Sequence, residues 1–220
     1  MRQQRKAYMK KIMIIILSLV FLVPTQLYAQ NKQLEKARKK QSKEKIKELK
    51  KDKWKIFGTT RTLEVSLLEH YDKLNKGGAD IYEMIGTADN FKSKNIGRQV
   101  CLNNVCNEYA RKAGSMVKGR ITSDANFDAT NKDAEFDKFY AAYESHVAKE
   151  LMGEIQESFS VIKENKDGTC SMQIFYTIDE SQAHRARMKA LQNAFEESKA
   201  AQKYAEKISK FIEEGFNPAD

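Results

Sequence analysis

Residues 93–121 read SKNIGRQVCLNNVCNEYARKAGSMVKGRI, and the spacing of apolar residues in this stretch decides the fold. One apolar row recurs at intervals of four, three and four, the period of one face of an α-helix, and it consists of Cys106, Ala110, Ala113 and Val117. A second row lies beside the first and consists of Leu102, Val105, Tyr109 and Met116. Because two adjoining rows leave only a narrow polar side, the stretch predicts a helix buried in the core.

The flanking sequence predicts strands and further helices on both sides of this helix. Before it, the expected elements are a strand over 54–59, a helix over 63–74 and a strand over 80–88 that is covered on both sides or crosses the sheet centre. After it, they are a helix over 136–151, two strands over 155–161 and 172–178 joined by a turn at 165–168, and a helix over 179–215. This order predicts an α+β fold in which helices pack against a mostly antiparallel sheet.

The last helix is expected to be one long, continuous element. Asp179, with Gln182 three residues later, resembles a capping box that opens a helix. The apolar row of this helix ends before Gly215 and consists of Ala186, Leu191, Ala194, Phe195, Ala201, Ala205, Ile208 and Ile212. The helix packs on its own sheet or pairs with a second copy of the chain, and the sequence leaves both arrangements open.

The N-terminal segment has the three-part layout of a secretory signal peptide. Residues 1–11 carry five basic residues and no acidic one, and residues 12–23 are almost wholly apolar. Pro24 ends the apolar run, and Ala29 offers a small residue for cleavage before Gln30. Because the run is shorter than the roughly 20 residues that a membrane-spanning helix needs, we expect cleavage and export to the periplasm or the outer membrane. An uncleaved anchor is the alternative.

The formal net charge of +9 is distributed unevenly along the chain. The leader holds 5 of the 39 Lys and Arg residues, and residues 30–55 hold another 12 against 4 acidic residues. The remaining chain has 22 basic and 26 acidic residues, a net charge of −4. A mildly acidic exported domain argues against nucleic acid as a partner. These divisions predict a signal peptide over 1–29, a lysine-rich helical spacer over 30–53 and a single α+β domain over 54–220.

The lysine-rich spacer is typical of a solvated helix, with a thin apolar row of Leu34, Ala37, Ile46 and Leu49. An isolated helix of this length is marginal in water. One interpretation is a plain charged spacer. The other is peripheral contact with an anionic membrane surface, where each basic residue contributes about 1 kcal/mol.

The cysteines and histidines form no recognised site. Cys101 and Cys106 stand five positions apart on the expected helix, so their side chains point in different directions, and Cys170 makes the total odd. We expect all three to be mostly small buried apolar residues. No second His or Cys stands at metal-binding spacing from a histidine, and we expect partly exposed positions for His70, His146 and His184. No nucleophile signature or glycine-rich phosphate loop occurs, so the sequence indicates no catalytic residue and no cofactor.

One loop partly matches a calcium-binding loop. Residues 124–135 read DANFDATNKDAE, and positions 1, 3, 5, 7 and 12 of the EF-hand pattern are filled by Asp124, Asn126, Asp128, Thr130 and Glu135. The pattern calls for glycine at position 6, where this chain has Ala129, and Lys132 places a positive charge at position 9. A plain polar loop is therefore the preferred interpretation, and a calcium site is the alternative.

Several of these segments resemble known envelope proteins. The strand end IGTA at 85–88, the helix through Ala110 and Ala113, and the hairpin followed by a long helix resemble small Gram-negative envelope lipoproteins. They are also similar to the N-terminal domain of a flagellar-ring assembly protein. The segments KSKNIGRQ, EFDKFYAAYE and QKYAEKI are closer to those of uncharacterised exported bacterial proteins. The lipid-bearing cysteine of the lipoproteins has no counterpart here, because the first cysteine is Cys101.

The resemblance implies a non-enzymatic exported envelope protein that serves as a protein-interaction or assembly module. Its expected partner is an envelope protein or surface component. The first alternative is a calcium-binding module that uses the loop over 124–135. The second alternative is an exported hydrolase whose catalytic residues are dispersed along the chain.

Overall fold

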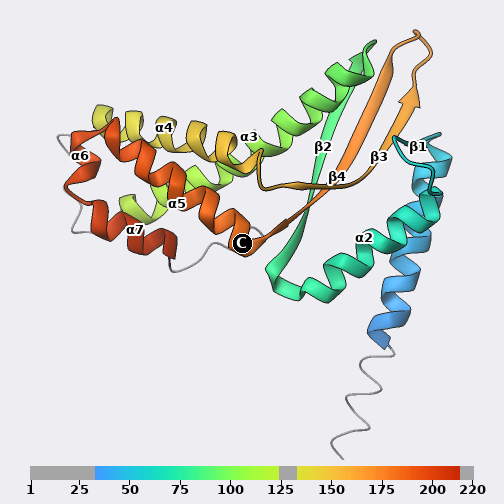
Figure 1. Cartoon of the computed structure of the whole chain (residues 1–220), viewed down its shortest axis with the longest axis horizontal. Helices are drawn as coiled ribbons and strands as arrows, with labels where there is room; N and C mark the ends of the chain where they lie inside the picture. Colours follow the sequence, from blue (N-terminus) through green and yellow to red (C-terminus); the bar gives the residue numbers. More distant parts are fainter. Residues whose placement is uncertain (1–32, 124–132, 214–220) are drawn as a thin grey trace, which may run out of the picture. The chain divides into compact units, whose positions relative to one another are not determined.

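The computed structural model describes residues 33–123 and 133–213 and contains two compact units, Met1–Glu48 and Leu49–Asp220. In the first unit, residues 33–48 are helical. The second unit has the expected α+β fold, and it begins at Leu49, ahead of the boundary at Trp54 that the sequence indicates (Figure 1). Within the described residues, no helix has the length and apolar character needed to cross a membrane. The expected signal peptide lies outside them.

The sheet has four antiparallel strands in the order β1-β3-β4-β2. These strands are β1 (Lys55–Phe57), β2 (Ile81–Phe91), β3 (Gln156–Glu164) and β4 (Cys170–Asp179). The predicted turn between β3 and β4 is confirmed, with Gly168 at φ 81° and its amide bonded to the Asn165 carbonyl at 3.2 Å. Of the two arrangements expected for the second strand, coverage on both sides is confirmed, because two different helices pack on β2. The strand does not cross the sheet centre, because within the described residues β2 forms an edge and pairs with β4.

The helices of the second unit follow the predicted order up to the C-terminal segment. They are α2 (Leu63–Gly77), α3 (Lys94–Ser123), α4 (Asp133–Leu151), α5 (Glu180–Glu196), α6 (Lys199–Gln202) and α7 (Ala205–Glu213), with a 3₁₀ turn at Gly78–Asp80.

The expected single C-terminal helix is wrong, because the segment breaks into α5, α6 and α7. The Ser198 hydroxyl donates a hydrogen bond to the Glu135 carbonyl at 3.1 Å and accepts one from the Ala201 amide at 3.2 Å. Ser198 therefore ends the straight path of α5 and caps a new helix. Gly215, the expected end of the long helix, lies outside the described residues.

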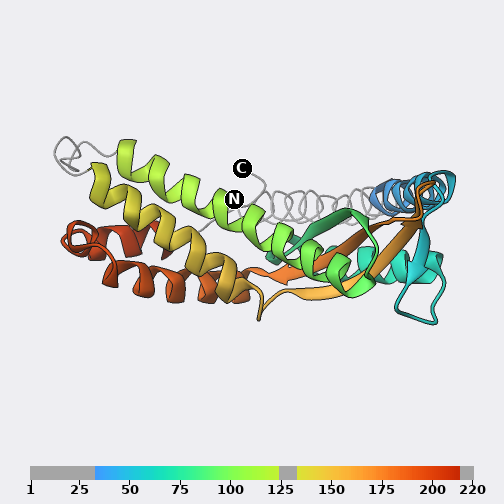
Figure 2. The same ribbon diagram turned by 90° about the horizontal axis from the view of Figure 1, so that it is seen from above.

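Helix α3 is buried along its length, as its two apolar rows predict. Val105 and Tyr109 are buried together with all four residues of the first row, whereas Glu108 and Arg111 are exposed. The helix contacts β2 and β4 of the sheet and then runs beside α4 to reach α7 (Figure 2). One helix therefore joins the sheet to the helical layer.

Helix α2 covers the opposite face of the sheet, where it packs on β2 and β3. Side chains alternate between the two faces of a strand. Accordingly, Ile174 and Tyr176 of β4 belong to the core around α3, whereas the Phe175 ring stacks on Phe159 at 4.3 Å and faces the His70 ring of α2. The sheet is thus covered by α3 on one face and by α2 on the other.

The approach of α3 to β2 requires glycine at position 86. A Cβ atom at this position would overlap the backbone carbonyl of Cys101. We expect Gly86→Ala to lower the free energy of unfolding by about 1–3 kcal/mol, because backbone atoms must shift to admit the methyl group. Chemical denaturation measures this change.

Gly119→Ala is the matched control, since Gly119 lies within α3 and an added Cβ there meets nothing within 4 Å. We expect this change to raise stability by about 0.5–1 kcal/mol, because alanine restricts the unfolded chain more than glycine does. Equal effects of the two substitutions would contradict the close contact between α3 and β2.

Candidate functional site at the start of helix α5

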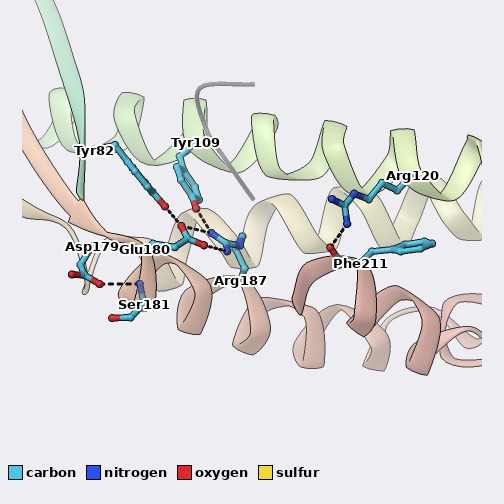
Figure 3. A network of polar contacts seen from close by, with 8 residues as sticks. All are labelled: Tyr82, Tyr109, Arg120, Asp179, Glu180, Ser181, Arg187 and Phe211. Atoms are coloured by element: carbon cyan, nitrogen blue, oxygen red, sulfur yellow. Dashed lines mark hydrogen bonds and ion pairs between the residues drawn. The ribbon is translucent and has the colours of Figure 1, made fainter. Parts of the chain in front are cut away.

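The junction between β4 and α5 positions most of the polar groups in the candidate site. Asp179 ends β4 in an extended conformation, and its carboxylate accepts a hydrogen bond from the Ser181 amide at 2.9 Å (Figure 3). The hydrogen bond from Ser181 holds the pKa of Asp179 below its usual value. Asp179 is therefore the N-cap of α5, as the sequence predicts.

A buried ion pair lies on the inner side of this junction. Arg187 is only 1% exposed, and its Nη2 lies 2.5 Å from Glu180 Oε1, where α5 begins. Arg187 Nη1 donates a hydrogen bond to the Tyr109 hydroxyl of α3 at 2.6 Å, and the Tyr82 hydroxyl of β2 donates to the Glu180 carboxylate (Figure 3). The four side chains bring β2, α3 and α5 together at one point.

A second polar contact joins α3 to the C-terminal helices. Arg120 Nη1 donates a hydrogen bond to the Phe211 carbonyl of α7 at 2.6 Å (Figure 3). A cation near the last carbonyls of a helix also interacts favourably with the helix dipole. The inner side of the site is therefore a structural network, in which charged side chains of α3 and α5 bond to groups on β2, α3, α5 and α7.

An open cleft lies beside the same junction and has a volume of about 290 Å³. We call it the α5 cleft. Its polar lining residues come from four elements and include Lys73 of α2, Gln156 of β3, Thr177 and Asp179 of β4, and Ser181 and Arg185 of α5. Ligand sites in proteins are usually concave and mostly apolar, with a few polar groups, whereas the lining of this cleft is mostly polar.

The first unit presents a separate candidate surface. Four exposed lysines stand at intervals of four, three and four on the helical segment, so they share one face, and we call Lys36, Lys40, Lys43 and Lys47 the lysine row. Among the described residues, Lys40 is the member of this row that has a carboxylate within ion-pair distance, 3.8 Å away on Glu44. The ammonium groups of the other three lysines can therefore interact with solvent or with an external partner.

Four of the five candidate calcium ligands lie outside the described residues, namely Asp124, Asn126, Asp128 and Thr130. The fifth, Glu135, stands near the start of α4 with Oε1 3.9 Å from Lys138 Nζ. Over 33–123 and 133–213, no group of three or more His, Cys, Asp or Glu side chains is arranged to hold a metal ion. The calcium interpretation stays a prediction.

The two cysteines of α3 lie where a thiol is a poor nucleophile. Cys101 and Cys106 are buried on α3, and burial raises the pKa of each thiol to about 12. Cys170, at the start of β4, is half-buried, and all three are free. Since the thiolate is the reactive form, the two α3 cysteines act as packing residues.

The expectation that all three histidines are partly exposed is wrong for His70. Its side chain is fully buried, with Nε2 2.7 Å from Glu83 Oε1. The reason is its place on the apolar face of α2, one turn after the buried Leu67. His146 and His184 are partly exposed, as expected.

The sequence analysis missed Arg187, Glu180 and Thr177. The first of these had a signal, because Arg187 interrupts a row of small apolar residues on α5 that is formed by Ala183, Ala190 and Ala194. A charge inside such a row indicates a buried ion pair. No comparable signal marks Thr177, which occupies an ordinary alternating position in a strand.

No family model matches the chain, and neither a curated protein nor a solved structure matches it. The residues themselves are therefore the basis for a proposed function.

The buried ion pair has a testable effect on stability. We expect Arg187→Met to lower the free energy of unfolding by about 3 kcal/mol, because it leaves the Glu180 carboxylate without its cation in a partly buried position. Replacing both residues by Met is expected to recover most of this loss, since the desolvation of both charges is then avoided. Chemical denaturation of the single and double variants measures both effects.

Arg185→Met is the control, because Arg185 stands on the same helix but is exposed, 3.1 Å from Glu154. An exposed ion pair contributes about 0–1 kcal/mol. If Arg187→Met destabilises the protein no more than Arg185→Met does, the buried pair does not hold the junction.

Proposed function

We propose that this protein is a non-enzymatic component of the bacterial cell envelope. Its lysine row contacts an anionic surface, and its α+β domain binds another envelope component. The observation that carries the proposal is the lysine row, which gathers four exposed cations on one helical face directly after the expected leader. The resemblance to exported envelope proteins agrees with this assignment.

The energetics of the lysine row support surface contact. A basic residue near an anionic membrane gains about 1 kcal/mol, and the gains of neighbouring residues combine when they face the surface together. The spacing of Lys36, Lys40, Lys43 and Lys47 meets that requirement. The attraction falls off within about 10 Å at moderate salt, so the contact is peripheral and reversible.

The domain itself has the features of a binding module. Its α3 thiols are buried, with their pKa values raised to about 12. Its fully buried cation, Arg187, is engaged with Glu180 and with Tyr109, and Glu180 also accepts a hydrogen bond from Tyr82. These groups stabilise the fold, which leaves surface recognition as the activity that the described residues support best.

We expect the chain that begins at Gln30 to bind vesicles that contain phosphatidylglycerol and not to bind vesicles of phosphatidylcholine. Binding should weaken as salt is added, because salt screens the attraction. Changing all four residues of the lysine row to Gln should lower the vesicle partition coefficient at least about tenfold. Vesicle flotation measures the bound fraction.

The matched control changes four exposed lysines on the domain to Gln, which alters the net charge equally: Lys92, Lys112, Lys166 and Lys203. We expect this control to retain binding. Equal loss in both variants would show that net charge, rather than the lysine row, drives association. Absence of binding to anionic vesicles would remove the surface contact from the proposed function.

A further inference from the structure

The outer edge of β2 is the longest unpaired strand edge among the described residues. β2 has 11 residues and lies at one side of the sheet, where it pairs with β4 (Figure 1). The strand at the opposite edge, β1, has three residues. A long strand edge exposes a row of N–H and C=O groups with which another strand can pair, and natural proteins usually shorten, bend or charge such an edge.

The register of the sheet shows which backbone groups point outward. In the turn before β4, the Asn165 amide donates a hydrogen bond to the Thr169 carbonyl at 2.8 Å, so these two residues form a hydrogen-bonded pair. Pairs with and without hydrogen bonds alternate along antiparallel strands. Counted in steps of two from Thr169, Phe175 and Thr177 therefore point their backbone groups toward β3 and away from β2.

The partners of Phe175 and Thr177 on β2 are Ile85 and Glu83. The N–H and C=O groups of these two partners consequently point away from β4, to the outer edge of the sheet. Thr87 supports this assignment independently, because its carbonyl accepts a hydrogen bond from a side chain outside the sheet, at 2.9 Å. In the part of the chain that the structure describes, no residue pairs with the outward groups of Glu83 and Ile85.

The two halves of this edge differ in their protection. At Thr87, the Asn104 side chain of α3 occupies the carbonyl, and beyond it the register with β4 shifts and Asn90 has a φ of 57°. Residues 81–85 contain no proline, no lysine and no register shift. The side chain of Ile85 is 37% exposed. Since capped groups and bends are usual means of closing an edge, the open part of the β2 edge is residues 81–85.

The charge of β2 favours a basic partner over a second copy of the chain. β2 and the turn before it carry three acidic side chains and no basic one, namely Asp80, Glu83 and Asp89. The Glu83 carboxylate contacts His70 through Oε1, and 32% of its side chain stays exposed. Antiparallel pairing of residues 81–85 with the same residues of a second copy would place two Glu83 carboxylates opposite each other, which is destabilising. A basic side chain opposite Glu83 is stabilising instead.

We propose that the outer edge of β2, over residues 81–85, binds an extended basic segment of another envelope protein by strand addition. The backbone of the segment pairs with Glu83 and Ile85, a lysine or arginine lies opposite Glu83, and an apolar side chain covers Ile85. In such complexes the main-chain hydrogen bonds give affinity and the alternating side chains give specificity. The inference rests on the proposed function, because it names the class of segment that the α+β domain would bind.

A fluorescently labelled peptide of sequence VTKTVTK, amidated at its C terminus, tests the proposal, because its valine and lysine side chains share one face of a strand. We expect saturable binding by the purified protein in fluorescence anisotropy at constant ionic strength, with amide NMR shifts at Glu83 and Ile85. The peptide VTETVTE should bind at least about tenfold more weakly, because its acidic side chains are repelled by those of β2.

N-methylation of the peptide separates strand addition from simple charge attraction. When the valine and lysine side chains lie on the same face as Glu83 and Ile85, the amides of those peptide residues face β2. Methylating the amides at the third and fifth positions should weaken binding about tenfold, because two hydrogen bonds are lost. Methylating those at the fourth and sixth positions leaves the paired edge intact and should leave binding unchanged.

Ile85→Lys should also weaken binding at least about tenfold, since a lysine closes a strand edge and repels a basic peptide. Met152→Lys is the matched control, because Met152 lies in the turn between α4 and β3 and is 38% exposed. This control adds the same charge and should bind the peptide as the unchanged protein does. Both variants should keep the far-UV circular dichroism of the unchanged protein, because both positions are exposed.

Three results would overturn the proposal: no saturable binding, equal binding of the two methylated peptides, or equal effects of Ile85→Lys and Met152→Lys. Self-association of the unliganded protein that Ile85→Lys removes, measured by sedimentation, would show instead that a second copy occupies the edge. Failure of the peptide to bind, while an envelope component is still crosslinked to the protein in cells, overturns strand addition and leaves the proposed function in place. Absence of any crosslinked component contradicts the proposed function itself.

Discussion

The packing of one long helix against two different layers is the constraint on which this structure depends. Helix α3 is about 45 Å long, at 1.5 Å per residue. The 11 residues of β2 span about 36 Å, so the helix is longer than the strand on which it packs. It meets the sheet where Gly86 lies under Cys101, and it meets the helical layer where Gly114 lies against Glu144 of α4. Because glycine has no side chain, these two positions allow α3 to approach β2 on one side and α4 on the other. The layers therefore share one core.

The start of α5 is the second place where the layers are joined. On the inner side, Arg187 and Glu180 form an ion pair. Arg187 also donates a hydrogen bond to Tyr109, and Glu180 accepts one from Tyr82, so both charged groups are part of the structural network. Beside it, the α5 cleft is lined by polar residues of α2, β3, β4 and α5.

Sequence periodicity predicted most of the fold, because the apolar rows of α3 and the N-cap at Asp179 are local signals. The break at Ser198 could not be predicted in this way, since it depends on the Glu135 carbonyl, which lies far away along the chain. The burial of His70 depends on the strands that α2 covers. The candidate cleft was not predictable either, because its lining residues lie far apart in the sequence.

The proposed envelope function is tested most directly by crosslinking the protein inside its own cells, followed by cell fractionation and identification of what is attached. We expect a chain that begins at Gln30, is released from the envelope fraction by high salt, and is linked to one dominant envelope component. Full-length chain in the cytosol, release only by detergent, or mature chain without any crosslinked component would contradict a peripheral envelope module.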